Sequence, residues 1–252
     1  MNIKTTHVGS LPYSNVEAAI DYTFKFDIPV LFSLPNFGAE HFMGSDILSY
    51  SRGWENFHSH SLDNLYFENE FFNAFNKQEK KQFKVQLIGP VTLHKYFLNE
   101  REYLEVESKL ISAYSKLIER LIHRGDLFFV LDEPALNEKI DIERFNSFSN
   151  ELSSGSASTI GVHCCGKLEL GLYEAISLEL KQLDWALYEL EQIPKNGRFF
   201  GGLEKFDHEI CQKLSFQSDN IIISPSCGLY GHSNPEEIFE QLQTVKNILI
   251  KK

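Results

Sequence analysis

The sequence lacks an apolar run of about 18 residues, the length that a transmembrane helix requires. Its opening segment, MNIKTTHVGS, lacks the apolar stretch of a secretory signal peptide. Basic residues are also few: the 24 Lys and Arg residues are outnumbered by 35 Asp and Glu residues. The formal net charge is therefore -11. That charge argues against nucleic acid or an anionic membrane surface as a partner. We therefore expect a cytoplasmic protein with neither kind of partner.

Nucleotide-binding motifs are missing as well. Neither GxGxxG nor GxxxxGK[ST] occurs, so no motif indicates a dinucleotide or P-loop site. The chain has only four cysteines, and structural disulfides are rare in the cytosol. Because two of these cysteines lie in HxC and SCG contexts, we interpret them as ligands rather than as halves of a bridge.

The sequence does contain a regular alternation of strand-like and helix-like segments. Short runs rich in β-branched and aromatic residues predict eight strands, at 3–9, 28–34, 84–89, 127–132, 158–165, 184–190, 198–204 and 220–226. Apolar residues at helical spacing predict helices between them, at 14–24, 100–123, 141–152, 168–181 and 233–249. Ser14 and Glu17 have the spacing of a capping box for the first helix.

This alternation places the chain in the α/β class. Eight strand–helix units in 252 residues predict a single (β/α)8 TIM barrel that spans residues 1–252. A doubly wound open sheet is the alternative. The aromatic-rich region 36–80 is the least regular, and we expect it to form an excursion of loop and helix over the barrel mouth.

Polar side chains follow several predicted strands, at the end where such barrels carry their chemistry. His163 and Cys165 close the fifth strand in GVHCCG, and Cys227 follows the eighth in SPSCGL. Side chains at i and i+2 share a face of a strand, so His163 and Cys165 should point together while Cys164 points into the core. An imidazole and thiolates from distant positions are ligands that proteins offer to zinc. The sequence therefore predicts a zinc site.

Three glutamates are candidates for the remaining zinc ligand. Glu189 and Glu191 both lie in the acidic segment YELEQ, and Glu204 follows the next strand. We expect Glu189, which lies nearer the strand, although a three-ligand His/Cys/Cys site with an open position is also chemically sensible. Cys211 lies in a predicted helix, FDHEICQKL, and we interpret it as structural.

The order of these motifs resembles the catalytic barrel of cobalamin-independent methionine synthase. HVGSLP, GPVTL, FVLDEPAL, GVHCCG and NIIISPSCGL follow one another across nearly the whole chain. HCCG with SPSCGL is most similar to short, single-barrel members of the uroporphyrinogen decarboxylase/methionine synthase-like superfamily. The resemblance implies four zinc ligands: His163, Cys165, Glu189 and Cys227. It also implies that Ser10 and Asp132 hold the amino-acid end of the substrate.

The resemblance further implies a zinc-dependent S-methyltransferase of methionine biosynthesis, with homocysteine or a related thiol as acceptor. The methyl donor would be methyltetrahydrofolate or a methylcorrinoid protein. Full-length family members use a second barrel to help hold the folate, and residues 1–252 are expected to form only one barrel, so the folate is not the sole candidate. Tyr96 stands where the family has a tryptophan that faces the pterin, and Trp54 is a second candidate for covering a flat donor. His232, close to Cys227 in the sequence, is a candidate general acid.

Two other interpretations compete with this one. A metal-free enzyme resembling uroporphyrinogen decarboxylase would need arginines for substrate carboxylates, and only Arg52 lies in a suggestive loop. A non-catalytic accessory protein that binds zinc or thiols would hold the metal without transferring a methyl group to any thiol.

Overall fold

The computed structural model describes residues 2–37, 62, 65–154, 158–165, 170–178, 180–184, 199–203 and 220–251. Its strands are β1 (Asn2–Thr5), β2 (Val30–Leu31), β3 (Gln82–Ile88), β4 (Asp126–Asp132), β5 (Thr159–His163), β6 (Leu180–Asp184), β7 (Phe199–Leu203) and β8 (Asn220–Pro225). Its helices are α1 (Val16–Thr23), α3 (Glu68–Phe75), α4 (Pro90–Phe97), α5 (Glu100–Ile122), α6 (Lys139–Ser154), α7 (Leu170–Ala175) and α9 (Pro235–Ile250).

All eight strands belong to one parallel sheet, in the order β1-β8-β7-β6-β5-β4-β3-β2. Every strand from β2 to β8 therefore pairs with the next one along the chain, without the reversal in strand order that defines a doubly wound sheet. The α/β class is confirmed. An isolated parallel bridge, Ser10 to Ser33, joins the segments that follow β1 and β2. No ladder joins β1 to β2 in the described ranges, so full closure of the barrel stays a prediction.

The sheet curves strongly enough for distant strands to meet on its inner face. Ile28, Phe128 and Ile222 form a small buried cluster apart from the main core. Phe128 lies on β4, Ile222 on β8, and Ile28 just before β2. Because these strands are not neighbours in the sheet, the contact requires the inner face to wrap around it. This curvature brings the carboxyl ends of β1, β4, β5 and β8 towards one another.

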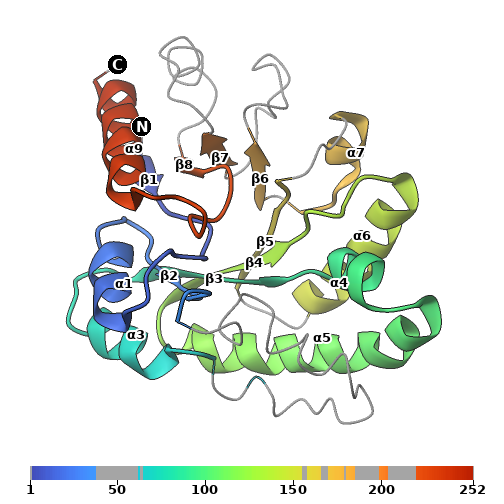
Figure 1. Ribbon diagram of the computed structural model, residues 1–252. Helices are drawn as coiled ribbons and strands as arrows, with labels where there is room; N and C mark the ends of the chain where they lie inside the picture. Colours follow the sequence, from blue (N-terminus) through green and yellow to red (C-terminus); the bar gives the residue numbers. More distant parts are fainter. Residues whose placement is uncertain are drawn as a thin grey trace.

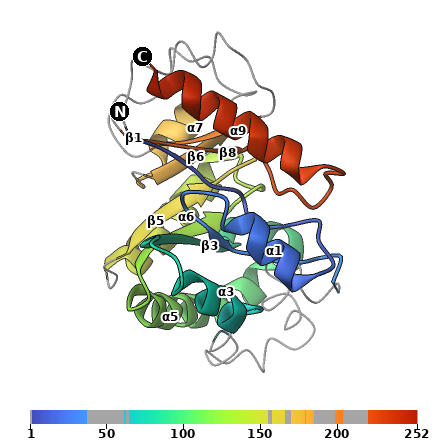
Figure 2. The same ribbon diagram turned by 90° about the vertical axis from the view of Figure 1, so that its left-hand side faces the viewer.

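The helices surround the strands and bury the outer face of the sheet (Figures 1 and 2). Helix α5 shows how the sequence specifies this layer. The Asn99 side chain caps it by accepting from the Glu102 backbone amide. The Glu102 side chain in turn accepts from the Asn99 backbone amide, which completes a capping box. Tyr114 on its buried face packs edge-on against Phe129 and donates to the Ile88 carbonyl at 2.6 Å. None of the described helices is long and apolar enough to cross a bilayer.

Three local predictions differ from the structure. The residue that caps α1 is Asn15, which accepts from the Ala18 amide, rather than Ser14. The strand β6 covers Leu180–Asp184 and overlaps the end of the predicted helix 168–181, whereas residues 185–190 of the predicted strand 184–190 lie outside the described residues. Helix α7 ends at Ala175, and tertiary pairing of 180–184 with β5 and β7 overrides the helical apolar spacing. Helix α4 was not predicted, although Pro90 at its first turn is a typical start signal.

The irregular region 36–80 is described only in part. Helix α3 lies within it and packs on the outer side of β3, where Phe72 meets Phe83 edge-on with ring centroids 5.2 Å apart. This helix therefore belongs to the outer layer, beside α1 (Figure 2). Residues 38–61, which carry most of the predicted excursion over the mouth, lie outside the described residues.

Candidate metal and substrate site

The site begins with a pair of residues at the carboxyl ends of β4 and β5. Asp132 and His163 are register partners on these parallel strands, so their side chains point to the same side. His163 Nε2 lies 3.8 Å from Asp132 Oδ1, and the imidazole is buried, with 1% of its side chain exposed. A buried imidazole beside a carboxylate at a strand end is in the position predicted for a site residue.

Two thiols lie at the same edge of the sheet. Cys165 follows β5 and Cys227 follows β8, and their side chains form a hydrogen bond. That bond and the burial of Cys165 raise the pKa of its thiol. Cys165 is partly buried and Cys227 is exposed, and neither is in a disulfide. Residues 62 positions apart in the chain are therefore brought into contact by the curvature of the sheet.

Strand alternation separates the adjacent cysteines as the sequence predicted. Cys164 is buried in the main core, where its thiol lies 3.8 Å from the Leu136 carbonyl as a weak donor. It thus faces the helix layer, while His163 and Cys165 face the inner side. The prediction that Cys164 is a core residue is confirmed.

The loop that carries Cys227 is fixed to the segment after β1. The Leu229 amide donates to the Ser10 carbonyl at 2.8 Å. A Cβ on Gly228 would come within 3.1 Å of the Ser10 Cβ, so a glycine allows the two segments to approach this closely. Ser10 itself is buried, and its hydroxyl accepts from the Ser33 hydroxyl at 3.3 Å. Ser10 therefore lies next to the cysteine loop, at the mouth where a substrate-binding role was expected.

The structure does not test the zinc prediction. His163 ends β5, Cys165 follows it, and Cys165 contacts Cys227 at the same edge of the sheet. Within the described ranges, however, no three His, Cys, Asp or Glu side chains are arranged as a group that could hold a metal ion. The candidates for the fourth ligand, Glu189, Glu191 and Glu204, lie outside the described residues, as does Cys211. The metal stays a prediction.

Asp132 is an unusual carboxylate. Burial and, to a smaller extent, the nearby Cys227 sulfur raise its pKa to about 7, and a hydrogen bond from Gln86 and the charge of Lys84 oppose this effect. Its side chain retains 18% exposure, although the Oδ1 atom is buried. A carboxyl group with a pKa this far from normal, at a strand end and between a thiol and an imidazole, is typical of a functional site.

Two further polar residues on the inner face were not singled out from the sequence. Lys84 and Gln86 lie on β3 with 0% and 3% exposure, and Lys84 Nζ donates to Gln86 Oε1 at 2.9 Å. Burial lowers the pKa of Lys84 to about 7, and Asp132 partly opposes that shift. The available signal was the i, i+2 pair of polar residues in the otherwise apolar run FKVQLIG.

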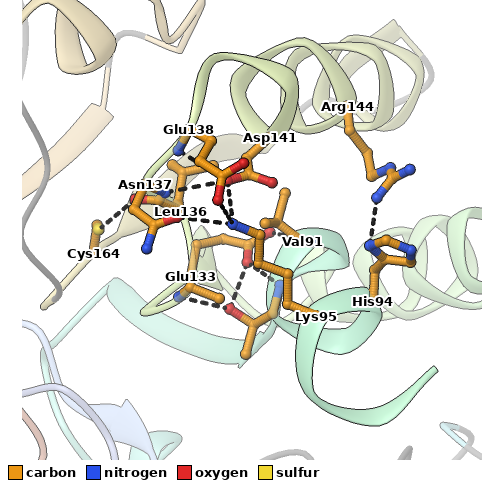
Figure 3. A network of polar contacts seen from close by, with 12 residues as sticks. Val91, His94, Lys95, Glu133, Leu136, Asn137, Glu138, Asp141, Arg144 and Cys164 are labelled. Atoms are coloured by element: carbon orange, nitrogen blue, oxygen red, sulfur yellow. Dashed lines mark hydrogen bonds and ion pairs between the residues drawn. The ribbon is translucent and has the colours of Figure 1, made fainter. Parts of the chain in front are cut away.

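Glu133 belongs to a different network, on the outer side of β4 (Figure 3). Its carboxylate accepts from the Val91 amide at 2.9 Å and from the Thr92 amide and hydroxyl at 2.7 Å each. It therefore caps the amino end of α4, and burial raises its pKa to about 8 despite these donors. A Cβ on Gly89 would lie 2.2 Å from its Cδ atom, so only glycine fits there.

For the other predicted site residues, the described part of the structure gives no contact with the site. His232 is exposed in the loop after β8, where its amide donates to the Leu229 carbonyl at 2.9 Å. Tyr96 lies on α4, but its side chain is not among those described. Trp54 lies outside the described residues. The structure therefore leaves the donor-binding and general-acid predictions untested.

Comparison with known proteins adds information on the fold. No protein family and no curated protein matches the sequence. Among the solved structures that match, we describe two that cover nearly the whole chain. One is described as the "Putative Vitamin-B12 Independent Methionine Synthase" of Listeria monocytogenes, at a TM-score of 0.59 and 15% identity, covering 97% of this chain and 96% of that one. The other is a methyltransferase from Methanosarcina mazei, at a TM-score of 0.67 and 10% identity, covering 99% and 94%. At these identities the likeness shows the fold alone.

Proposed function

We propose that this chain is a zinc-dependent methyltransferase that moves a methyl group to a thiol, with homocysteine as the acceptor and methionine as the product. The observation that carries the proposal is the meeting of one buried imidazole and two thiols with the Asp132 carboxylate at the carboxyl edge of the sheet. The two structural neighbours support it, because one is described as a methionine synthase and the other as a methyltransferase.

The donor set suits zinc. His163, Cys165 and Cys227 would hold the ion, and Glu189 is our choice for the fourth ligand. Zinc binds thiolates and imidazole readily, and two thiols already in contact with each other require little rearrangement to share an ion. When bound, the metal would keep a substrate thiol deprotonated while leaving its sulfur nucleophilic.

The remaining roles fall to the chain's own residues. Asp132 would accept the substrate ammonium group, and Ser10 would fix the amino-acid end beside the loop of Cys227. The substrate sulfur then forms a bond to the methyl carbon while the bond from that carbon to the donor nitrogen or cobalt breaks. The electron pair stays with the donor. A folate donor needs a proton at that nitrogen, for which His232 is the candidate. Orientation of the two reactants is the main contribution of such a site.

Several finer statements belong to the same proposal. We propose that the sheet closes into a (β/α)8 barrel, and that residues 1–252 form one catalytic domain. The methyl donor is methyltetrahydrofolate or a methylcorrinoid protein, with Tyr96 and Trp54 as the aromatic residues that would cover it. A cytoplasmic location follows if the thiol ligands are to stay reduced.

One assay tests the proposal. Purified protein loaded with zinc is incubated with homocysteine and, in parallel, with methylcobalamin or methyltetrahydrofolate, and methionine is quantified by mass spectrometry. We expect methionine with one of the two donors and none with metal-free protein. Bound zinc without methyl transfer to homocysteine or to other thiols would instead support a binding protein.

A further inference from the structure

We propose that Lys84 and Gln86 are positioning residues, which hold the Asp132 carboxylate in place at the carboxyl edge of the sheet through a one-way chain of hydrogen bonds. This inference rests on the proposed function, in which Asp132 binds the substrate, and it gives a role to two buried residues that the motif pattern did not indicate. It predicts that both residues act on substrate affinity through Asp132, rather than on the metal or on the chemical step.

The chain of hydrogen bonds runs in one direction. A lysine ammonium group can only donate, so the atom that accepts from Lys84 Nζ at 2.9 Å is the amide oxygen of Gln86. The other end of that amide, Nε2, is then the donor in the hydrogen bond from Gln86 to the Asp132 carboxylate. Lys84 therefore determines which end of the amide faces Asp132, because a flipped amide would turn its oxygen towards the carboxylate.

Strand register explains why these three side chains follow one another. Lys84, Gln86 and Ile88 alternate onto the same face of β3, and Ile88 is the register partner of Asp132 on β4. Gln86 thus lies one inward-facing position below the level of Asp132, and Lys84 lies two below it. The chain therefore leads from the middle of the inner face to its carboxyl edge, where the substrate would bind.

Burial makes a purely structural role a poor explanation for Lys84. Lys84 and Gln86 are 0% and 3% exposed, and Phe128, the register partner of Lys84, belongs to the apolar inner cluster. A lysine in such surroundings is held there at a cost in desolvation that an apolar side chain would avoid. Its charge is useful at this point, however, because Lys84 and the Asp132 carboxylate attract each other. The position therefore fits a residue that serves the site rather than the fold.

Steady-state kinetics of the zinc-loaded protein with homocysteine test the inference. Gln86→Met keeps the side-chain length but removes the donor to Asp132, so KM for homocysteine should rise about 10-fold while kcat changes by less than about threefold and the zinc content stays the same. Lys84→Met should raise KM by a smaller factor, because the Gln86 amide remains but its orientation is no longer fixed. The double variant should be no worse than Gln86→Met alone, since Lys84 acts through Gln86.

Gln86→Glu separates positioning from packing. It keeps the size of the side chain and the acceptor for Lys84 Nζ, but it presents a carboxylate instead of a donor to Asp132, so it should raise KM at least as much as Gln86→Met does. A role in packing alone predicts a KM close to that of the wild-type protein for this variant. Gln78→Met is the matched control, because Gln78 is exposed on the surface and should keep the wild-type kinetics. Circular dichroism verifies that each variant is folded.

A second measurement does not depend on catalysis. In proton–nitrogen NMR spectra, the side-chain amide of Gln86 is identified as the pair of signals that is missing from Gln86→Met. One proton of this pair should exchange slowly with solvent, because it is buried and bonded to the Asp132 carboxylate. Both Asp132→Ala and Lys84→Met should shift the pair, since each removes one of the two bonds that fix the amide.

The outcomes separate the two proposals. An unchanged KM in folded Gln86→Met, or a double variant in which the two single effects simply add, overturns the positioning role and leaves the methyltransferase proposal standing. If the wild-type protein forms no methionine with either donor, the methyltransferase proposal fails and the amide spectrum decides the inference. Gln86 signals that neither Asp132→Ala nor Lys84→Met shifts would then overturn it as well.

Discussion

Two polar networks lie on opposite sides of β4, and they differ in how completely they are satisfied. The inner network consists of Lys84, Gln86, Asp132, His163, Cys165 and Cys227, at the carboxyl edge of the sheet. The outer network consists of Glu133 with its donors Val91 and Thr92, at the amino end of α4 (Figure 3). Asp132 and Glu133 are adjacent in the sequence, yet they belong to different networks because successive side chains point to opposite faces of a strand.

The contrast teaches which buried carboxylate serves the fold and which serves the site. Glu133 accepts three hydrogen bonds at 2.7–2.9 Å, as a structural group does. Asp132 instead has its Oδ1 atom 3.8 Å from the buried His163 imidazole, and a thiol lies nearby whose charge raises its pKa. Natural proteins tolerate such unfavourable arrangements mainly where a ligand later satisfies them.

The largest effect should come from the inner thiols and imidazole. Cys227→Ser or His163→Ala should lose bound zinc, and methyl transfer should fall by at least about 100-fold, because even residues that only orient metal ligands contribute 10- to 100-fold. Cys164→Ser is the matched control, since Cys164 faces the core and should keep the metal. Zinc per chain is measured by elemental analysis. Full zinc occupancy in both ligand variants would reject the assignment.

The second effect should separate the adjacent carboxylates. Glu133→Ala leaves three buried donors without their acceptor and should lower the free energy of unfolding by about 3 kcal/mol. Asp132→Ala should leave stability unchanged or slightly higher, because it removes a carboxylate held at a cost in the interior, but it should abolish amino-acid binding. Urea unfolding and calorimetry measure the two properties. Equal loss of stability in both variants would contradict the contrast between the networks.

A third effect concerns pH. Burial depresses the pKa of Lys84 to about 7 in the folded protein, so the unfolded chain binds its proton more tightly. The free energy of unfolding should therefore fall as pH falls from about 10.5 to about 7, with a slope of up to about 1.4 kcal/mol per pH unit from this group. Lys84→Met should flatten that slope, whereas the exposed Lys77→Met should keep it. Identical slopes in wild-type protein and Lys84→Met, measured by urea unfolding across this range, would show that Lys84 keeps its charge.

The smallest effect should come from the glycine beside the cysteine loop. Gly228→Ala brings a Cβ to 3.1 Å from the Ser10 Cβ, so the loop must shift by a few tenths of an ångström, and we expect a loss of activity of only a few-fold. Gly89→Ala places its Cβ 2.2 Å from Glu133 Cδ and should act on stability instead, by displacing the cap of α4. Activity and urea midpoints compare the two variants. An effect of Gly228→Ala on stability as large as that of Gly89→Ala would contradict this division.

Much of the fold could be predicted from local patterns. Apolar runs identified the strands that are buried on both faces, such as β4, and the Asn234-Pro235 pair at α9 marked a helix start. The prediction failed at β6, where residues 180–184 fit a helical stripe but pair with neighbouring strands instead. Local spacing cannot show which pairing partner is available in the folded chain.

The candidate site was predictable only where strand geometry determines it. The i, i+2 rule correctly turned His163 and Cys165 to one side and Cys164 to the other. The contact of Cys165 with Cys227 depends on the curvature of the whole sheet, and the motif pattern could support it only through the expected barrel. Lys84 and Gln86 were overlooked because polar residues within an apolar strand carry no motif, and only their burial reveals them.

X-ray absorption at the zinc edge tests the central claim most directly. Purified protein should show one zinc ion with two sulfur ligands at about 2.3 Å and a nitrogen ligand at about 2.0 Å, and saturating homocysteine should add a third sulfur. Absence of sulfur from the zinc coordination shell, or a spectrum that homocysteine leaves unchanged, would contradict the account.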